Sequence, residues 1–488
     1  MPLWYILSLK GSVFNNSIEA TNYFFETGLF QEVDPAFMFN FQTSCTNDPM
    51  FGQLWGLRNT TNAGIDINIC NAWTITRGAG VSVAVIDQGI DPNHDDLRGN
   101  FHSLSFNAQI GQSPSAFVSS QNHGTHVAGI IGGIRNNGLQ VVGVAPEARI
   151  MRVSHSLSTA RPNASAELAS GISWAWYEAR ADVINNSWGD WGGQHFNLLH
   201  SAVLESAIES ALRYGRNGKG AIVVFASGNT GLSNRVDYPG SSHDDILVVG
   251  SINANGRRSS FSNHGNRLNV VAPGNNILST NNNNDTITMS GTSMAAPHVA
   301  GIAALILSVR PDLTQAQVRR AIESTAQRLR NYSFNVNRPN GPWNNQVGHG
   351  LVNAYAAVRA VTPFISGPGS FCMQATFELH NGQATNWILS DNLNFRVVPM
   401  SSTRVSVAAT NPMASGLSTR LSAMYHGTEI AFVHVFSFCD ISPCGCPPGW
   451  CECGRPICPF CGGWGCPMCA TVRAHPNPVS DVLTIDLT

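Results

Sequence analysis

Residues 290–301 read Ser-Gly-Thr-Ser-Met-Ala-Ala-Pro-His-Val-Ala-Gly and lead into an apolar run at 302–307. This pattern predicts a loop that gives way to a buried helix, with Ser293 close to the helix N-terminus. A hydroxyl and a backbone N–H at that end lie in the positive field of the helix dipole, which stabilises an anion forming there. Serine at a helix start is also a common N-cap, so the stretch alone leaves a nucleophile and a cap open. Pro297 is expected in the first turn, where it needs no hydrogen-bond donor.

A serine nucleophile requires a base, and the base requires a group that orients it. Residues 81–87, Val-Ser-Val-Ala-Val-Ile-Asp, predict a buried strand that carries Asp87 at its carboxyl end. In the stretch Asn-His-Gly-Thr-His-Val-Ala-Gly at 122–129, His123 stands at the start of a second small-residue helix and His126 lies within it. A lone Asp after a strand is more often a turn residue, and a lone His is more often structural, so neither stretch decides the chemistry alone.

Taken together, the three stretches resemble the motifs of subtilisin-type serine endopeptidases, in which Asp, His and Ser follow one another in this order. The matching motifs cover residues 85–90, 123–129 and 291–298. Gln88 departs from the small or hydroxyl residue usual after the Asp, but it leaves the carboxylate intact. The resemblance implies a secreted enzyme that hydrolyses peptide bonds in proteins through an acyl-enzyme intermediate. Its catalytic triad would consist of Asp87, His123 and Ser293.

The resemblance also implies residues that contact the substrate. Asn229 ends an Ala-Ser-Gly-Asn stretch and would donate its side-chain amide to the oxyanion, beside the N–H of Ser293. An Asn after Gly in a turn is otherwise ordinary. The backbone of the segment Ser187, Trp188 and Gly189 would form hydrogen bonds with the substrate, which binds as an added strand. Trp188 stands where an aliphatic residue is frequent, so we expect the wall of the pocket for the P1 side chain to be bulkier or reshaped.

Apolar strands alternate with helices across this region. The expected strands cover 81–86, 148–153, 181–189 and 221–229, and the expected helices cover 164–180 and 198–214. Continuous apolar strands separated by helices predict an α/β fold with a mainly parallel sheet covered by helices on both faces. Active residues in such sheets gather at the carboxyl ends of the strands, where Asp87, Ser187 and Asn229 fall.

A calcium site is implied by the same resemblance. Residues 135–146 follow the His helix and end in Gly-Val-Ala-Pro, like the family loop that wraps a calcium ion. Mapped onto this chain, Asp96 and Asn137 would supply side-chain oxygens, and Arg135, Leu139 and Val141 would supply backbone carbonyls. Hard oxygen ligands of mixed origin suit calcium, although Asn-Asn-Gly within the loop is by itself an ordinary turn. The chemistry needs no catalytic cofactor.

Length and composition predict several domains without a nucleic-acid partner. The chain has 488 residues, 12% charged residues and a formal net charge of −2, which gives no electrostatic case for nucleic acid or an anionic membrane. We find no apolar run of the ~18 residues that a membrane span needs. The expected organisation is a propeptide remnant at 1–46, a subtilisin-like peptidase domain at 47–361, a small immunoglobulin-like β-sandwich at 363–438, a Cys-rich segment at 439–470, and the start of a C-terminal sorting domain at 471–488.

Cysteines concentrate near the C-terminal end. Nine of the twelve lie within 439–469, where disulfides, a metal site such as zinc, or neither remain open, because the four-residue gaps between pairs are shorter than zinc-finger spacings. Cys45 and Cys70 lie apart from them and are candidates to bridge each other.

Segments outside the peptidase domain suggest how the chain is exported. Residues 474–485 resemble the opening of the sorting domain that the type IX secretion machinery recognises, and the sandwich resembles modules of secreted Bacteroidetes enzymes. The propeptide of the enzyme itself would act as its inhibitor and folding chaperone.

Two rival functions remain. One is a metal-dependent hydrolase centred on the cysteines, which no His-Glu zinc pattern supports. The other is an adhesin with a silent protease fold, and the filled triad positions weigh against it.

Overall fold

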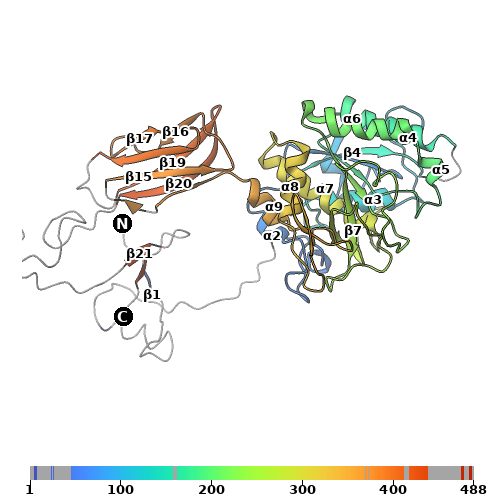
Figure 1. The fold of residues 1–488 in the computed structure, drawn as a ribbon, viewed down its shortest axis with the longest axis horizontal. Helices are drawn as coiled ribbons and strands as arrows, with labels where there is room; N and C mark the ends of the chain where they lie inside the picture. The colour runs from blue at the N-terminus through green and yellow to red at the C-terminus, as the bar shows by residue number, and fades with distance from the viewer. Residues whose placement is uncertain are drawn as a thin grey trace, which may run out of the picture. The chain divides into compact units, whose positions relative to one another are not determined.

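The computed structural model describes residues 5–7, 24, 26, 45–157, 162–368, 370–371, 373–410, 417–437, 474–476 and 483–485. The chain divides into two compact units, of which one spans Thr43–Thr362. The other combines Met1–Gln42 with Pro363–Thr488. Figure 1 shows the elements of both units, which are described separately below.

A seven-stranded parallel sheet forms the centre of the first unit, in the order β3-β4-β2-β5-β6-β7-β8. Every residue of β5, β6 and β7 is buried, as expected for strands covered on both faces. The expected α/β fold is therefore confirmed. The strands are β2 (Ser82–Asp87), β3 (Phe101–Asn107), β4 (Arg149–Ser154), β5 (Val183–Asn186), β6 (Ile222–Ala226), β7 (Leu247–Ile252) and β8 (Val270–Pro273).

Helices pack against this sheet in two pairs. α7 contacts β5 to β8, and α3 packs on α7 and β2. α4 and α6 pack on each other, with α4 against β2 and α6 against β6; they lie together at the top of Figure 1. The helices are α2 (Ile69–Ala72), α3 (His123–Gly132), α4 (Ala164–Ser173), α5 (Phe196–Leu199), α6 (Ala202–Gly218), α7 (Thr292–Val309), α8 (Gln315–Ser324) and α9 (Ala354–Val361). A π-helical turn at Trp174–Glu178 replaces the end of the helix expected over 164–180.

Smaller elements complete this unit. Two hairpins lie outside the main sheet, β9 (Ile277–Asn281) with β10 (Asp285–Met289) and β11 (Val336–Arg338) with β12 (Gly341–Trp343). Short 3₁₀ turns occur at Phe51–Gln53 and Arg98–Asn100.

α7 is the central helix of the unit. Its residues 292–307 are all buried, because the helix is apolar around its whole circumference. In the part of the chain that the structure describes, α7 alone is long and apolar enough to cross a membrane, with a mean hydropathy of 1.6, contrary to our expectation that no apolar run has that length. Some 89% of the helix is buried inside the protein, as expected of a core helix.

Pro297 lies deeper in α7 than the sequence predicted. The helix begins at Thr292, so Pro297 is in the second turn, and the expectation of the first turn is wrong. A proline there cannot donate to the carbonyl four residues earlier, which is that of Ser293. The hydroxyl of Ser187 donates to this carbonyl instead, at 2.9 Å. The side chain of Ser187 thus satisfies the acceptor that the proline leaves free.

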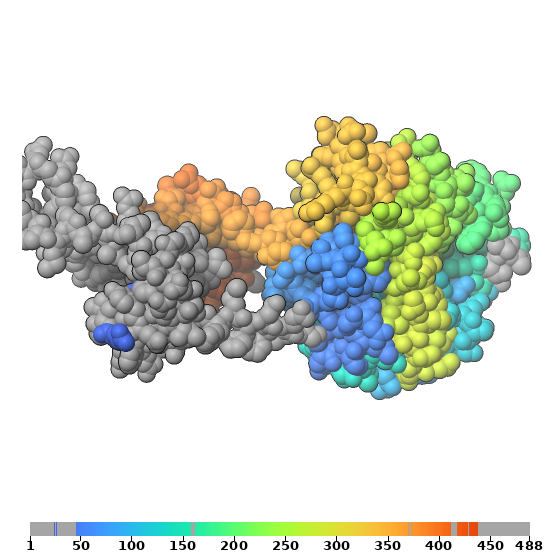
Figure 2. Space-filling view, turned by 90° about the horizontal axis from the view of Figure 1, so that it is seen from below, coloured from blue at the N-terminus to red at the C-terminus, as the bar shows by residue number. Residues whose placement is uncertain are grey.

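The first described residues of this unit pack on one of its faces. Figure 2 shows this segment, in blue, beside the yellow-green part of the chain. Trp55 Nε1 donates to the carbonyls of Asn275 and Asn276, each at 3.1 Å, and Asn59 Nδ2 donates to the carbonyl of Ala254 at 2.9 Å. These long-range hydrogen bonds attach the segment to the loop before β9 and the turn after β7.

The second unit contains a sandwich of two four-stranded sheets, β13-β15-β18-β17 and β14-β20-β19-β16. Phe377, Phe395, Val407, Leu421 and Val435 are among the buried side chains of its core. All pairs are antiparallel except β14 with β20. The strands are β13 (Phe364–Ser366), β14 (Ser370–Phe371), β15 (Gln374–His380), β16 (Asn386–Leu389), β17 (Phe395–Pro399), β18 (Arg404–Ala409), β19 (Leu417–Tyr425) and β20 (Thr428–Ser437). The expected small sandwich is thus present.

Three further strands belong to this unit. β1 (Tyr5–Leu7) pairs in parallel with β22 (Leu483–Ile485), which pairs antiparallel with β21 (Ala474–Pro476). The Cys-rich segment 439–470 and most of the expected propeptide remnant 1–46 lie outside the described residues. The five-domain division therefore stays a prediction.

Candidate active site

Asp87 and His123 meet at the carboxyl edge of the sheet. Asp87 is the last residue of β2 and is fully buried, and His123 is the first residue of α3. The Nδ1 of His123 lies 2.7 Å from Asp87 Oδ1, which also accepts from the backbone N–H of Gln88 at 2.8 Å. A carboxylate on Nδ1 leaves Nε2 as the nitrogen that can accept a proton. The pair thus has the geometry of a base and its orienting group.

Burial lowers the pKa of His123, but the negative charge of Asp87 and the hydrogen bond to it act in the opposite direction and leave this pKa above its ordinary value. His126, one turn further along α3, differs in this respect. It is buried, its Nε2 lies 3.0 Å from the carbonyls of both Ile277 and Ile287, and burial with the nearby charge of His123 lowers its pKa to about 4. His126 is therefore neutral at pH 7 and connects α3 to the hairpin of β9 and β10.

Ser293 is the second residue of α7 and does not cap the helix, because Gly291 occupies the N-cap position. The side chain of Ser293 donates to the carbonyl of Ser187 at 3.0 Å. With the bond from Ser187 Oγ to the carbonyl of Ser293, the two serines make reciprocal contacts between the end of β5 and the start of α7. Ser293 and His123 line one cavity of about 450 Å³, together with Asn229.

The side chain of Asn229 is held by the residue that precedes Ser293. Asn229 Oδ1 accepts from the backbone N–H of Thr292 at 2.8 Å and from its hydroxyl at 2.9 Å. Because the oxygen is occupied in this way, the amide nitrogen points away from Thr292. A Cβ built on Gly291 would lie 3.3 Å from Asn229 Nδ2 and 3.6 Å from Ser293 N. The two expected oxyanion donors thus lie around one position, which Gly291 leaves open.

We expect Asn229→Ala to reduce kcat by about 10²–10³-fold with little change in KM, since an oxyanion donor acts in the transition state; this range is the one known for removal of the equivalent donor in subtilisin. Steady-state kinetics on a peptide substrate measures the effect. Asn276→Ala, a substitution outside this cavity, is the control. An Asn229→Ala variant with unchanged kcat would contradict the assignment.

The expected substrate segment borders a second cavity of about 220 Å³ that Ser293 and Asn229 also line. Ser187, Trp188 and Gly189 follow β5 and contribute to its wall. Trp188 is almost fully buried, with its indole ring edge-on to Phe225 at 5.1 Å between centroids. Trp188 therefore places an aromatic side chain in the wall of the cavity beside Ser293.

Two residues near these sites were not identified from the sequence. Asp237 lines the second cavity, although nothing in its loop between β6 and β7 marks it. Thr292, which orients the side chain of Asn229, was not predicted as a site residue, because in the motif only its neighbour Ser293 has an expected catalytic role. A carboxylate in a loop has no periodicity, so only the folded chain shows where it lies.

Some of the residues that were expected to bind calcium lie in contact with one another. Asp96 is buried, and its two oxygens accept from Asn137 Nδ2 at 2.7 Å and from Val141 N at 2.9 Å. Burial raises the pKa of Asp96 against these hydrogen bonds, and the nearby Asp48 carboxylate contributes in the same direction. The Leu139 side chain is exposed. The described residues contain no group of three or more His, Cys, Asp or Glu side chains placed to hold a metal, so a site here needs amide and carbonyl oxygens in addition to carboxylates.

Asp48 adds a carboxylate to this loop that the sequence did not predict. Its Oδ2 accepts from the hydroxyl of Thr46 and from Asn136 N, the latter at 3.1 Å. Its Oδ1 is buried and has no hydrogen-bond partner among the residues described. A buried carboxylate oxygen without a partner is costly unless a cation balances it. This feature fits a cation beside Asp48 and Asp96.

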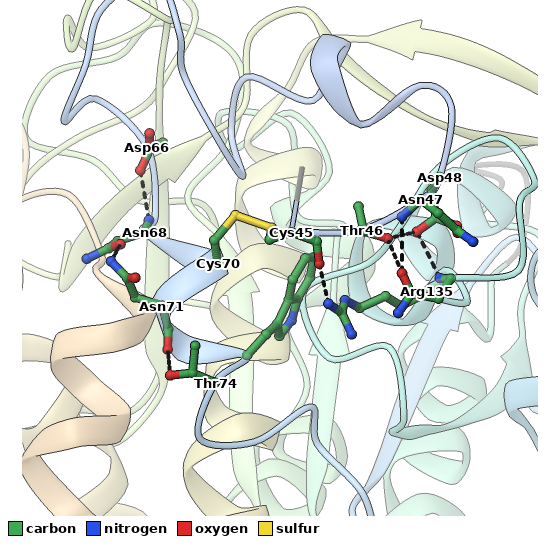
Figure 3. Close-up of a disulfide and its surroundings, with 12 residues drawn as sticks. Cys45, Thr46, Asn47, Asp48, Asp66, Asn68, Cys70, Asn71, Thr74 and Arg135 are labelled. Atoms are coloured by element: carbon green, nitrogen blue, oxygen red, sulfur yellow. Dashed lines mark hydrogen bonds between the residues drawn. A yellow bond between two sulfur atoms is a disulfide. The ribbon is translucent and has the colours of Figure 1, made fainter. Parts of the chain in front are cut away.

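Figure 3 shows how the disulfide lies next to this loop. Cys45 and Cys70 are bonded, as expected, with a Cα–Cα distance of 5.6 Å. The carbonyl of Cys45 accepts from the guanidinium of Arg135, which also lies 5.0 Å above the ring of Trp73. The cross-link thus connects the segment carrying Asp48 to α2.

A parallel α/β sheet with Asp–His and Ser at its carboxyl edge is the arrangement of a serine hydrolase. The family model described as "Subtilase family" matches residues 78–350 of this chain. The chain is similar to subtilisin E from Bacillus subtilis, with 39% identity over 58% of this chain and 66% of that protein. It is also similar to subtilisin DY from Bacillus licheniformis, with 36% identity over 58% of this chain and 92% of that protein.

A solved protease structure from Pseudoalteromonas arctica PAMC 21717 is similar as well, with a TM-score of 0.51 and 30% identity over 65% of this chain and 99% of that one. Since the family model covers more than half of the chain, this protein belongs to the subtilase family. It is a serine endopeptidase, a hydrolase of the class to which the subtilisins belong.

Proposed function

We propose that this enzyme cleaves peptide bonds in proteins through the triad Asp87, His123 and Ser293. The observation that carries the proposal is the 2.7 Å contact between Asp87 and His123 beside a cavity that His123 shares with Ser293. No other nucleophile is implied by the family motifs. The enzyme therefore needs no thiol or metal for the chemical step, because His123 activates the serine itself.

Each residue has one task in this mechanism. His123 removes the proton from Ser293 as its oxygen attacks the substrate carbonyl, forming a tetrahedral oxyanion. Asn229 Nδ2 and Ser293 N donate to that oxyanion. His123 then passes its proton to the leaving amine, and water hydrolyses the acyl-enzyme by the same route in reverse. Asp87 keeps the imidazole in the required tautomer and balances its charge.

The serine hydroxyl must change its partner for this chemistry. In the structure it donates to the carbonyl of Ser187, in the segment expected to pair with the substrate backbone. Catalytic hydrogen bonds often form only in the substrate complex. We infer that substrate pairing along Ser187, Trp188 and Gly189 accompanies the turn of the Ser293 hydroxyl toward His123 Nε2.

A fluorophosphonate probe tests the proposal, because it reacts with an activated serine. We expect one labelled peptide, that containing Ser293, and no labelling of enzyme that is heat-denatured before the probe is added. Labelling at another serine, or no labelling of an enzyme that still cleaves protein, would contradict it.

We propose a structural calcium ion at the loop that follows α3. Asp96 and Asn137 would bind it through side-chain oxygens and Arg135, Leu139 and Val141 through carbonyls, with Asp48 as an added carboxylate. The unpartnered oxygen of Asp48 and the burial of Asp96 support this site. Bound calcium would balance these charges and order the loop; it has no part in the chemical step.

Chelation should lower the melting temperature if calcium binds only the folded state. At a calcium concentration 100 times its Kd, the stabilisation is about 2.7 kcal/mol. Asp96→Ala should remove most of the difference between calcium and chelator, while Asp66→Ala, outside the loop, should keep it. Differential scanning calorimetry with calcium and with EGTA measures this. A melting curve that chelator leaves unchanged would refute the site.

We also propose that the enzyme is exported. The Cys45–Cys70 disulfide supports an oxidising compartment, because such bonds are rare in the cytosol. Export through the type IX machinery, and inhibition and folding assistance by a propeptide at 1–46, rest on the sequence resemblance. Fractionation of the producing cells, with immunoblotting of medium and membrane fractions, tests the location.

A further inference from the structure

A single carboxylate, that of Asp237, stands among the described residues that line the second cavity. Asp237 is 3% exposed and lines the same cavity as Ser293. Its Oδ1 accepts from Gly192 N at 3.0 Å and from Asn263 Nδ2 at 2.7 Å. Its Oδ2 accepts no hydrogen bond from any described residue, yet it is not enclosed by protein. A carboxylate oxygen without a partner therefore reaches the cavity.

This carboxyl group lies between the two backbone segments that border the cavity. A Cβ built on Gly228 would lie 2.5 Å from Asp237 Oδ2, and one built on Gly189 would lie 2.9 Å from Asp237 Cβ. Gly189 belongs to the expected substrate segment, and Gly228 precedes the expected oxyanion donor Asn229. Because neither glycine has a side chain, there is room for the carboxyl group of Asp237 beside the expected path of the substrate.

Neighbouring charges leave the cavity with an excess of negative charge. Asp190 is fully buried next to Asp237, and its own ion pair is with Arg235 at 2.9 Å. Two carboxylates thus lie near one guanidinium, which pairs with Asp190. Among the described residues no ion pair neutralises the free oxygen of Asp237. His195 also lines the cavity.

We propose that Asp237 determines specificity and that this cavity takes a basic P1 side chain, with lysine as the simplest fit. The inference rests on the proposed function, because it requires Ser293 to be the nucleophile. A volume of about 220 Å³ is several times the ~30 Å³ share of one water molecule, so an extended side chain has room. One free oxygen suits the point charge of an ammonium better than the two-pronged guanidinium. The pairing is stronger than on an open surface, because the Asp237 side chain is almost fully buried.

The pH dependence of the preference should follow from the same groups. Burial, with the charge of Asp190 adding to it, raises the pKa of Asp237 to about 6, despite its two hydrogen bonds and Arg235. Below this pKa the carboxyl is neutral and attracts no ammonium. Preference for lysine over an uncharged side chain should therefore rise as the pH passes upward through about 6.

The test uses the full chain and peptide substrates that differ only at P1, carrying lysine or its uncharged isostere norleucine. At pH 8 we expect kcat/KM for lysine to exceed that for norleucine by about 10-fold or more, and Asp237→Asn to bring the ratio close to one. Asp312→Asn, a largely exposed aspartate, should keep the wild-type ratio. Titration of active sites with the fluorophosphonate probe corrects for misfolded enzyme, and Asp237→Ser serves as a second variant.

A wild-type ratio at or below one would overturn the proposal, as would a preference for lysine that survives in Asp237→Asn and Asp237→Ser. The ratio in the wild type between pH 5 and pH 8 needs no variant, and a ratio that stays constant would also count against it. An enzyme that cleaves neither substrate and is not labelled at Ser293 would instead refute the proposed function.

Discussion

Replacing Ser293 with alanine should reduce kcat by roughly 10⁶-fold, a magnitude known from removal of the triad serine in subtilisin rather than calculated from this structure. The physical reason is that the acyl-enzyme cannot form without the hydroxyl, and no other nucleophile is implied by the motifs. Activity well above that of water should nevertheless remain, since the oxyanion donors at Asn229 and Ser293 N are kept. Turnover of a peptide substrate by purified protein measures the loss.

Stability of the Ser293→Ala variant distinguishes chemistry from folding. The substitution removes one hydrogen bond, that to the carbonyl of Ser187, which is worth only about 1 kcal/mol. The melting temperature should therefore change little. Ser308→Ala, at the other end of the same helix, should keep its turnover. A loss of kcat far smaller than roughly 10⁶-fold in Ser293→Ala would show that the nucleophile assignment is wrong.

Replacing Asp87 with asparagine should lower kcat by about 10⁴-fold, the magnitude known for the corresponding change in a chymotrypsin-type protease. The amide can donate to His123 Nδ1, which favours the wrong tautomer. The negative charge of Asp87 also keeps the pKa of His123 above its ordinary value. Because only neutral His123 can act as a base, wild-type kcat/KM should fall as the pH drops through that raised pKa.

The fall of kcat/KM at acid pH, here called the acid limb, should occur at a lower pH in Asp87→Asn than in the wild type. The reason is that the negative charge that favours the protonated form of His123 is gone. A pH profile of kcat/KM for both enzymes measures the shift. Asp95→Asn, close in sequence and exposed, should retain the wild-type profile. A variant with an unshifted acid limb would show that the limb reports a group other than His123.

The sequence alone predicted the parallel sheet, which the structure confirms, and it proposed the triad, of which Asp87 and His123 lie in contact. Apolar runs between helices identified β2, β4, β5 and β6, since strands buried on both faces need continuous apolar residues. The three motifs are local, with each functional residue next to the glycines and small residues that shape its turn. Asp87, Ser187 and Asn229 were expected at one edge because the carboxyl ends of parallel strands meet there.

Only the tertiary structure decided which groups share a partner across the chain. The carbonyl of Ser293, left free by Pro297, is satisfied by Ser187, more than a hundred residues earlier. Asn229 is oriented by Thr292, and Asp237 reaches the cavity between Gly189 and Gly228. These contacts join loops that have no periodicity, and hydrogen bonds depend on distances of a few tenths of an ångström. The sequence motifs therefore determined which residues were proposed for catalysis. The packing of distant loops decided how the expected hydrogen-bond donors are oriented and which charged side chain lines the second cavity.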